Sequence, residues 1–121
     1  MLKIYITLVV LLIFDSSYLE AQNYGAWSLT DSLRFPSWHS ASVELANGNI
    51  LVTGGISKDS GNINVAEIYN YETEKWQIIS PMVLGRAYHL LLKLSDGNVM
   101  TISGGTYENR SCEIYDTTTK T

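Results

Sequence analysis

The chain repeats one pattern of residues at a spacing of 50. In each copy a histidine precedes a glycine pair, and a strand-like segment with glutamate, isoleucine and tyrosine follows. The repeated residues are His39, Gly54, Gly55 and Tyr69 in the first copy and His89, Gly104, Gly105 and Tyr115 in the second. The histidines, and likewise the glycine pairs, lie 50 residues apart. A period of this size is typical of supersecondary units that bury their apolar faces only against stacked neighbours.

Each copy consists of short strand-like segments, and no part of the chain after residue 21 sustains a helical period. The predicted strands are 40–45, 50–53, 65–71 and 75–79 in the first copy, then 90–94, 99–103 and a third ending at Asp116. Asn47-Gly48 and Asp96-Gly97 predict type I′ hairpin turns, which need positive φ angles. The second copy has one residue fewer before its turn and one more after it, which is compatible with a β-bulge. The predicted fold class is all-β.

The first copy resembles a kelch repeat. The resemblance lies in Gly54-Gly55, residues 66–70, residues 72–76 ending at Trp76, and Pro81-Met82, while residues 86–89 resemble the start of the next repeat. The variant is similar to kelch repeats of secreted and bacterial proteins, including the central domain of galactose oxidase-like proteins. The resemblance extends from residue 27 to residue 121. It implies four-stranded antiparallel β-propeller blades, about two of them, in an incomplete ring.

We divide the chain into a signal peptide at 1–21, which rests on the composition of the N-terminus, and kelch repeats at 22–121, which rest on the resemblance. With the strands of a blade named a to d in chain order, we expect a lone strand d at 27–33, a full blade at 38–80 and a partial blade at 86–121. A propeller closes with about four to eight blades. Two explanations stay open: the chain is a truncated part of a longer propeller, or three copies associate head to tail into a six-bladed ring.

The N-terminus predicts secretion. An apolar run at 4–14 follows Lys3 and is shorter than the roughly 20 residues that span a bilayer, as in a secretory signal peptide. We expect cleavage near Ala21, with an uncleaved membrane anchor as the alternative. Removing residues 1–21 takes away one basic and two acidic residues, so the net charge changes from −4 to −3. The scattered basic residues argue against a nucleic-acid partner or, after cleavage, a membrane partner.

The chain has one cysteine, Cys112. In a secreted protein an odd cysteine indicates either an intermolecular disulfide or a buried thiol. Cys112 occupies the repeat position of Ala66, a small inward-facing residue, and this favours the buried thiol.

The longer connections b–c and d–a share one edge of the predicted sheets, and loops on a rigid scaffold commonly bind ligands. The candidate ligand-binding residues there are Lys58, Asp59, Arg86, Tyr107, Glu108 and Arg110. Solvated loop residues without a ligand are the alternative. Asn109-Arg110-Ser111 is a glycosylation sequon, and a glycan on Asn109 would block part of this edge.

His39 and His89 suit copper ligation as in galactose oxidase-like enzymes, but their repetition favours a structural role. We interpret the whole repeated set as structural: His39, Gly54, Gly55, Tyr69, Trp76, His89, Gly104, Gly105 and Tyr115. No catalytic constellation, metal site or cofactor is predicted. The expected function is a secreted scaffold that binds a protein or glycan, without enzyme activity. The alternatives are a non-catalytic portion of a galactose oxidase-like copper enzyme and a truncated product without independent function.

Overall fold

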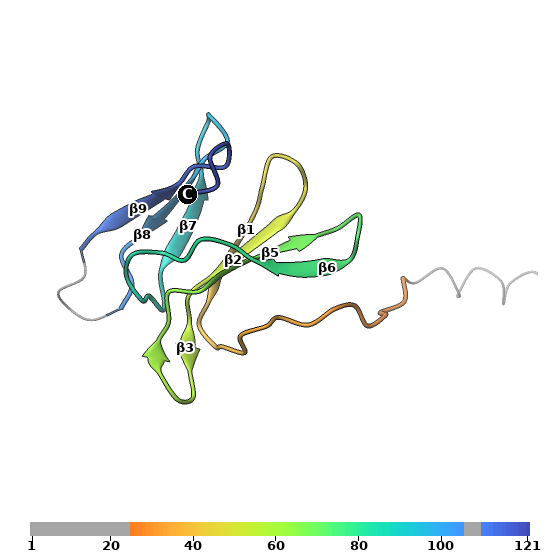
Figure 1. Ribbon diagram of the computed structural model, residues 1–121, viewed down its shortest axis with the longest axis horizontal. Coiled ribbons are helices and arrows are strands. Elements are labelled where there is room, and N and C mark those ends of the chain that lie inside the picture. Colours follow the sequence, from red (N-terminus) through yellow and green to blue (C-terminus); the bar gives the residue numbers. More distant parts are fainter. Residues whose placement is uncertain (1–24, 106–109) are drawn as a thin grey trace, which may run out of the picture.

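The computed structural model describes residues 25–105 and 110–121, and these residues form only β-strands, turns and loops (Figure 1). The predicted all-β class is confirmed. Within the same residues there is no helix long and apolar enough to cross a membrane. The predicted signal peptide lies outside the described residues, and so do Tyr107, Glu108 and Asn109.

The strands form two antiparallel sheets and a small hairpin. Sheet 1 has the order β1-β2-β5-β6, and sheet 2 has the order β7-β8-β9. The bounds in sheet 1 are β1 Ala41–Glu44, β2 Ile50–Thr53, β5 Ala66–Asn70 and β6 Lys75–Ile78. The bounds in sheet 2 are β7 Leu90–Lys93, β8 Val99–Ile102 and β9 Cys112–Tyr115. The hairpin of β3 (Ile56–Ser57) and β4 (Gly61–Asn62) interrupts the connection from β2 to β5.

The core lies between the two sheets. Its buried members are Leu45, Leu51 and Ala66 from the first copy and Val99 from the second. Around them pack the partly buried side chains of Val43, Ile68, Ile79, Leu91 and Tyr115. The strands β1 and β7 are in contact, so the sheets stand side by side with their first strands together (Figure 1). Each sheet therefore relies on the other to bury its apolar face.

The hairpin turns differ from the predicted type I′ form. The Gly48 N–H donates to the Leu45 carbonyl at 3.0 Å, and the Leu45 N–H donates to the Asn49 backbone carbonyl at 2.8 Å. This bonding encloses a three-residue loop, and only its last residue, Gly48, has a positive φ of 83°. The Asn47 side chain accepts the Asn49 N–H at 3.2 Å, which stabilises a type I turn followed by a left-handed glycine. The turn at Gly97 has the same backbone hydrogen bonds.

The spacing of the structural repeat is 49 residues, not 50. His39 and Tyr88 take the same left-handed conformation, with φ of 59° and 56°. The pairing Ala41↔Thr53 in sheet 1 corresponds to Leu90↔Ile102 in sheet 2. From these positions through the second strand the offset stays constant, so sheet 2 has no bulge. The prediction that His39 and His89 are equivalent is therefore wrong.

The glycine pairs are likewise displaced by one residue. Gly54 and Gly55 have φ of 62° and 103°, and the residues in their place in sheet 2 are Ser103 and Gly104, with 59° and 81°. The next position is Ile56 in the first copy and Gly105 in the second. The N–H of each donates to a corresponding carbonyl, that of Trp38 or Ala87. The repeat is thus conserved in backbone geometry while the glycines shift along it.

The structure has no strand at 27–33, where the sequence predicts a lone strand d. Trp27 and Leu29 are fully exposed there. The end of this segment contacts sheet 1 by other hydrogen bonds: Asp31 accepts the Trp76 N–H at 3.1 Å and the Trp76 indole N–H at 3.2 Å. The side chain and carbonyl of Asp31 thus bind β6 where a strand ladder would have used backbone groups alone.

Cys112 is exposed, so the prediction of a buried thiol is wrong. Its counterpart Ala66 is 3% exposed because sheet 2 covers that face of sheet 1. Cys112 lies on the corresponding face of sheet 2, and no described residue covers that face. The repeat position was identified correctly, but its burial depends on the next layer.

Candidate functional site

A groove lies at the edge of sheet 1 opposite the β1–β2 turn. The β3–β4 hairpin projects from this edge, as Figure 1 shows at the bottom of the molecule. The groove has a volume of about 730 Å³ and is lined by residues 35–36, 57–60, 62–65 and 85. Its walls therefore come from the segment before β1, the b–c connection and the d–a connection. These are two of the loop classes predicted to bind a ligand.

Lys58 and Asp59 line the groove from the tip of the hairpin, and both are exposed. The Ser57 hydroxyl accepts the Ser60 N–H at 3.0 Å and closes the tip between them. Two opposite charges at adjacent positions offer a donor and an acceptor to a polar ligand. The structure brings these two predicted residues together.

The other walls of the groove consist of residues that were not predicted from the sequence. Phe35 contributes an aromatic ring that is 45% exposed, while Asn62 and Asn64 contribute amide groups. The Asn64 side-chain NH₂ donates to the Met82 carbonyl at 2.9 Å and ties the b–c connection to the d–a connection. The two asparagines in a long loop could have been recognised in the sequence as candidate ligand contacts. The position of Phe35 beside the groove could not, because it depends on how the segment before β1 folds.

Gly85 allows two walls of the groove to meet. A Cβ atom at this position would lie 2.5 Å from the Asn62 carbonyl oxygen, closer than real Cβ contacts allow. The N–H of the next residue, Arg86, donates to the Ile63 carbonyl at 3.1 Å. The groove is thus backed by a direct backbone contact between segments more than 20 residues apart in the chain.

Arg86 is not available to a ligand, and its prediction as a contact is wrong. The residue has no exposed area. Its guanidinium donates to the Ser103 carbonyl at 2.6 Å, to the Ser111 carbonyl at 2.9 Å and to Glu113 at 2.8 Å. The arginine therefore ties the d–a connection to both ends of the loop between β8 and β9. The sequence correctly placed Arg86 in a loop, but it did not show that the guanidinium points into the protein.

Glu113 is held by several donors. Burial raises its pKa, but the N–H groups of Val83 and Leu84 and the Arg86 side chain lower it, and the net pKa lies below its usual value. The Val83 N–H donates at 2.6 Å and the Leu84 N–H at 3.2 Å. The carboxylate is therefore ionised at neutral pH and accepts hydrogen bonds from backbone N–H groups.

Glu67 makes the same kind of contact one repeat earlier. It accepts the N–H groups of Arg34 at 2.9 Å and Phe35 at 3.0 Å. These donors lie 49 residues before Val83 and Leu84. The repeated glutamate thus fixes the chain segment that enters each sheet.

The two histidines have different surroundings. His89 is 5% exposed, and its Nε2 lies 2.8 Å from the Thr53 hydroxyl. Burial and the charge of Arg86 lower the pKa of His89 below its usual value. His39 is exposed and stacks on Tyr88, with ring centroids 4.0 Å apart. Residues 25–105 and 110–121 contain no group of three or more histidine, cysteine or acidic side chains that could hold a metal ion.

Tyr69 and Trp76 pack against each other on sheet 1, with ring centroids 5.2 Å apart. The Tyr69 hydroxyl lies 2.7 Å from the Thr30 hydroxyl. Among the remaining predicted ligand contacts, Arg110 is exposed, whereas Tyr107 and Glu108 lie outside the described residues. The glycosylation prediction at Asn109 also lies outside them.

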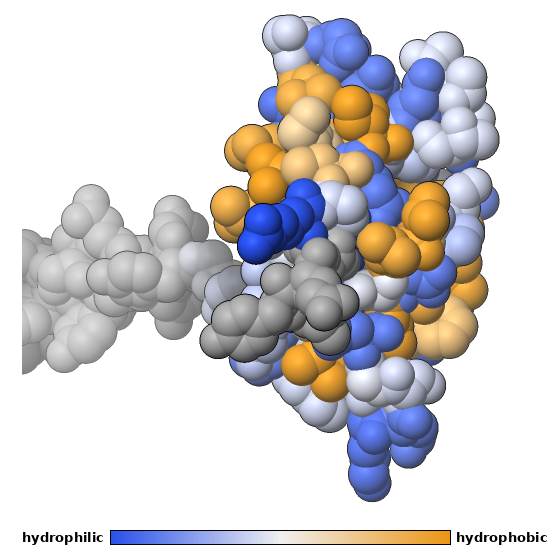
Figure 2. Space-filling model, turned by 90° about the vertical axis from the view of Figure 1, so that its left-hand side faces the viewer, coloured by the Kyte–Doolittle hydropathy of each residue, from blue (hydrophilic) through white to orange (hydrophobic). Residues whose placement is uncertain are grey.

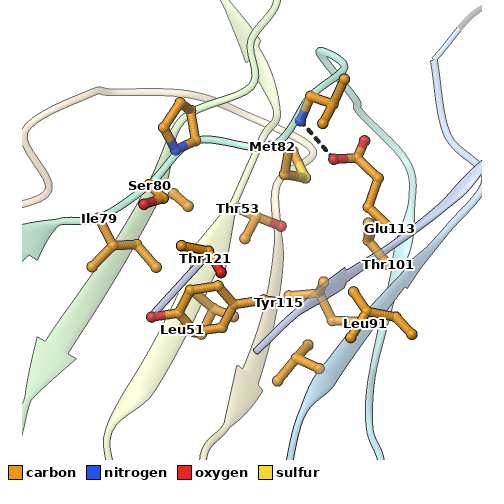
Figure 3. A pocket seen from close by; sticks show the side chains of 15 residues that line it. Leu51, Thr53, Ile79, Ser80, Met82, Leu91, Thr101, Glu113, Tyr115 and Thr121 are labelled. Atoms are coloured by element: carbon orange, nitrogen blue, oxygen red, sulfur yellow. Dashed lines mark hydrogen bonds between the residues drawn. The ribbon is translucent and has the colours of Figure 1, made fainter. Parts of the chain in front are cut away.

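A second cavity, of about 120 Å³, separates the sheets (Figure 3). Leu51 and Thr53 line it from sheet 1, and Thr101 and Tyr115 line it from sheet 2. The Thr101 hydroxyl is buried and has no hydrogen-bond partner among the residues that the structure describes. The small size and mostly apolar lining of this cavity make it part of the packing between sheets.

A family model for the Kelch motif matches residues 37–83. These residues include all four strands of sheet 1, the β3–β4 hairpin and the first part of the d–a connection. The match supports a kelch repeat at this place in the chain. A search of curated proteins found no match.

Proposed function

We propose, from the premise that residues 37–83 form a kelch repeat, that the chain is a β-propeller scaffold whose groove beside the β3–β4 hairpin binds a protein ligand. The groove itself is the observation that carries the proposal. It is concave, it lies on a loop edge of a rigid sheet, and it combines an exposed aromatic ring with charged and amide groups. Such a mixture suits an extended polypeptide with its own backbone donors and acceptors.

The charges at the groove favour a peptide that carries both signs. Lys58 offers three donors and Asp59 offers acceptors only, and neither makes an ion pair among the described residues. Asn62 supplies a further amide close to the hairpin tip. A ligand that pairs with these groups would have its contacts partly desolvated against Phe35, which strengthens each hydrogen bond.

Selection of displayed random peptides against the protein tests the proposal. We expect enriched peptides to bind with affinities that fall at least about tenfold, or about 1.4 kcal/mol, in Lys58→Glu and in Asp59→Lys. Glu72→Lys is the matched control, because Glu72 is an exposed charged residue in the turn between β5 and β6. Isothermal titration calorimetry gives the dissociation constants. Equal affinities in all three variants would overturn the proposal. Binding to a glycan microarray without any peptide binding would also overturn it.

We propose further that this binding takes place outside the cell. The support is the short apolar run at 4–14 after Lys3, which has the composition of a signal peptide. Mass spectrometry of the protein from a secretory host is expected to give an N-terminus at Gln22. A chain that retains residues 1–21 in the membrane fraction would contradict it.

A further inference from the structure

Sheet 2 presents an apolar face on the side away from sheet 1. Leu90, Leu92 and Ile114 are 65%, 50% and 55% exposed on this face, and Cys112 is exposed beside them. Figure 2 views the molecule from this side and shows hydrophobic residues gathered there in several patches. A monomer gains nothing from exposing large side chains next to one another, so such a face indicates an interaction surface.

The face of sheet 1 that packs on sheet 2 is also apolar at the corresponding ladder positions. Val43 pairs with Leu51, as Leu92 pairs with Met100. Leu51 pairs in turn with Ile68, as Met100 pairs with Ile114. In sheet 1 these residues belong to the core and contact sheet 2. Sheet 2 thus repeats, one residue for one, the surface by which sheet 1 binds its neighbour.

The opposite face of sheet 1 matches the surface that such a neighbour provides. Sheet 2 contacts sheet 1 through Val99 and Tyr115, which pair with each other across β8 and β9. Ile50 and Tyr69 are the corresponding pair in sheet 1 and face away from sheet 2. The entering segment is also equivalent, because Glu67 holds it as Glu113 does in sheet 2. At these positions the outer face of sheet 1 thus carries a β-branched residue and a tyrosine, as does the face of sheet 2 that packs on sheet 1.

The strand edges match as well. In sheet 1, β5 pairs with β6, whereas β9 has no partner on its outer edge among the described residues. The segment 27–30 lies 49 residues before 76–79, which contain most of β6 and its aromatic Trp76. Trp27 and Leu29 are each 102% exposed. An unpaired strand edge and an unpaired strand-like segment thus lie on opposite sides of the molecule.

We propose that a second copy of this chain docks on sheet 2 head to tail. Residues 27–30 of that copy pair with β9, and the outer face of its sheet 1 covers Leu92 and Ile114. The register follows from β5 and β6, where Tyr69 pairs with Trp76. Transferred by the repeat, it places Tyr115 opposite Trp27 and Cys112 opposite Thr30. This association is independent of the peptide groove, which lies on a loop edge.

The contact is heterologous, because one copy uses sheet 2 and the other uses sheet 1. Contacts of this kind form a closed ring when the rotation between copies allows it, and open filaments when it does not. With the two sheets described in each copy, a propeller ring of about four to eight blades corresponds to about two to four copies. The proposed assembly is the closed ring, because ring closure removes every unpaired edge, which an open chain of copies leaves at both ends.

A cysteine cross-link tests the register. Paired residues of antiparallel strands have Cα atoms about 4.5–5.5 Å apart, within the range that a disulfide spans. Thr30→Cys is therefore expected to form disulfide-linked multimers with the native Cys112 of another copy under mild oxidation, visible on a non-reducing gel. Tryptic peptides joined through residues 30 and 112 identify the bond by mass spectrometry.

Two matched variants control the cross-link. Ser28→Cys moves the thiol two residues along the same segment and is expected to give no multimers. Thr30→Cys combined with Cys112→Ser is expected to give no cross-link, because the thiol opposite position 30 is then absent. The proposal is overturned if Thr30→Cys stays monomeric with free thiols, if its disulfide forms within one chain, or if its multimers match those of Ser28→Cys.

Size-exclusion chromatography with light scattering tests whether the outer face of sheet 2 is an interface between copies. The unmodified protein is expected to give one discrete multimer, and Ile114→Lys is expected to give a monomer with the same circular dichroism spectrum. Val83→Lys is the control, because Val83 is 83% exposed and lies outside this face. If Ile114→Lys fails to fold, Leu92→Lys replaces it. A monomer at about 100 μM for the unmodified protein, or aggregates without a fixed size, would overturn the proposal.

Discussion

At the scale of single residues, the two arginines that precede the sheets have opposite surroundings. Arg86 has no exposed area and donates to two carbonyls and a carboxylate. The Arg34 side chain is 54% exposed and pairs with Asp31 at 3.4 Å. Removing a buried partner costs about 3–5 kcal/mol, whereas exposed ion pairs contribute about 0–1 kcal/mol. The chemistry of the side chain is the same, so the difference comes from burial alone.

We therefore expect Arg86→Met to lower the free energy of unfolding by at least about 3 kcal/mol and Arg34→Met to lower it by less than about 1 kcal/mol. Urea unfolding followed by tryptophan fluorescence measures both variants. Equal losses would show that the buried network around Arg86 contributes no more than a surface ion pair.

His89 makes stability depend on pH. Its folded pKa is lowered by burial and by Arg86 from the ordinary value of 6.5, so the unfolded chain binds the proton more readily than the folded one. The resulting stability is fully present above about pH 6.5 and is lost as the pH falls below that value toward the folded pKa. We expect the urea midpoint to decrease between pH 7.5 and 5.5.

His89→Gln is expected to reduce this decrease, because the amide does not titrate and still reaches the Thr53 hydroxyl. His39→Gln is the control and is expected to keep the full decrease, since the His39 ring is exposed and stacks on Tyr88. An unchanged pH dependence in His89→Gln would assign the effect to other groups.

The roles of these residues were only partly predictable. The sequence places Arg86 and Lys58 in the same class of loop. Only the fold reveals that Arg86 donates inward to the carbonyls of Ser103 and Ser111, because every residue offers a carbonyl and none is marked in the sequence. Lys58 is exposed in the long b–c connection, which the sequence does place on the surface, but the β3–β4 hairpin that carries it was not predicted.

At the scale of elements, the strands were predictable and the details of their turns were not. Alternating apolar residues define β1, β2, β5 and their counterparts within one or two residues. The turn type depended on side-chain hydrogen bonds such as that of Asn47, which compete with the type I′ geometry. The repeat length was misread because Ser103 adopts a left-handed φ of 59° where the first copy has a glycine.

The glycine in the β7–β8 turn provides a test of the observed geometry. Gly97 has a φ of +88°, and a Cβ atom there would have its nearest neighbour, the Ala46 Cβ, at 4.0 Å. The cost of Gly97→Ala is therefore conformational and not steric. We expect a loss of about 1 kcal/mol for Gly97→Ala and a smaller loss for Gly97→Asn, because asparagine tolerates this region. Equal losses in thermal unfolding would contradict the left-handed assignment.

At the scale of the whole molecule, the two sheets share one core and should unfold together. Leu51 of sheet 1 is 1% exposed and belongs to the same cluster as Val99 of sheet 2. We expect Leu51→Ala to cost about 3 kcal/mol through the cavity it leaves. Hydrogen exchange is expected to accelerate in β8 as well as in β2.

Val83→Ala is the matched control, because Val83 is 83% exposed and lies outside the shared core. It is expected to cost less than about 1 kcal/mol, because it removes mostly exposed surface. Acceleration confined to β2 in Leu51→Ala would show that the sheets unfold separately.

The 49-residue spacing also sets the length of any piece of this chain that can be duplicated or grafted. A duplicate of residues 38–86 contains 49 residues. Inserted after Arg86, it begins at residue 38, whose backbone position is equivalent to that of residue 87. A piece measured from one glycine pair to the next carries one residue too many. Since neighbouring side chains on a strand point to opposite sides, that surplus residue would turn the inserted layer inside out. The ends of an inserted repeat should therefore be chosen by equivalent backbone conformation and not by the glycine pairs.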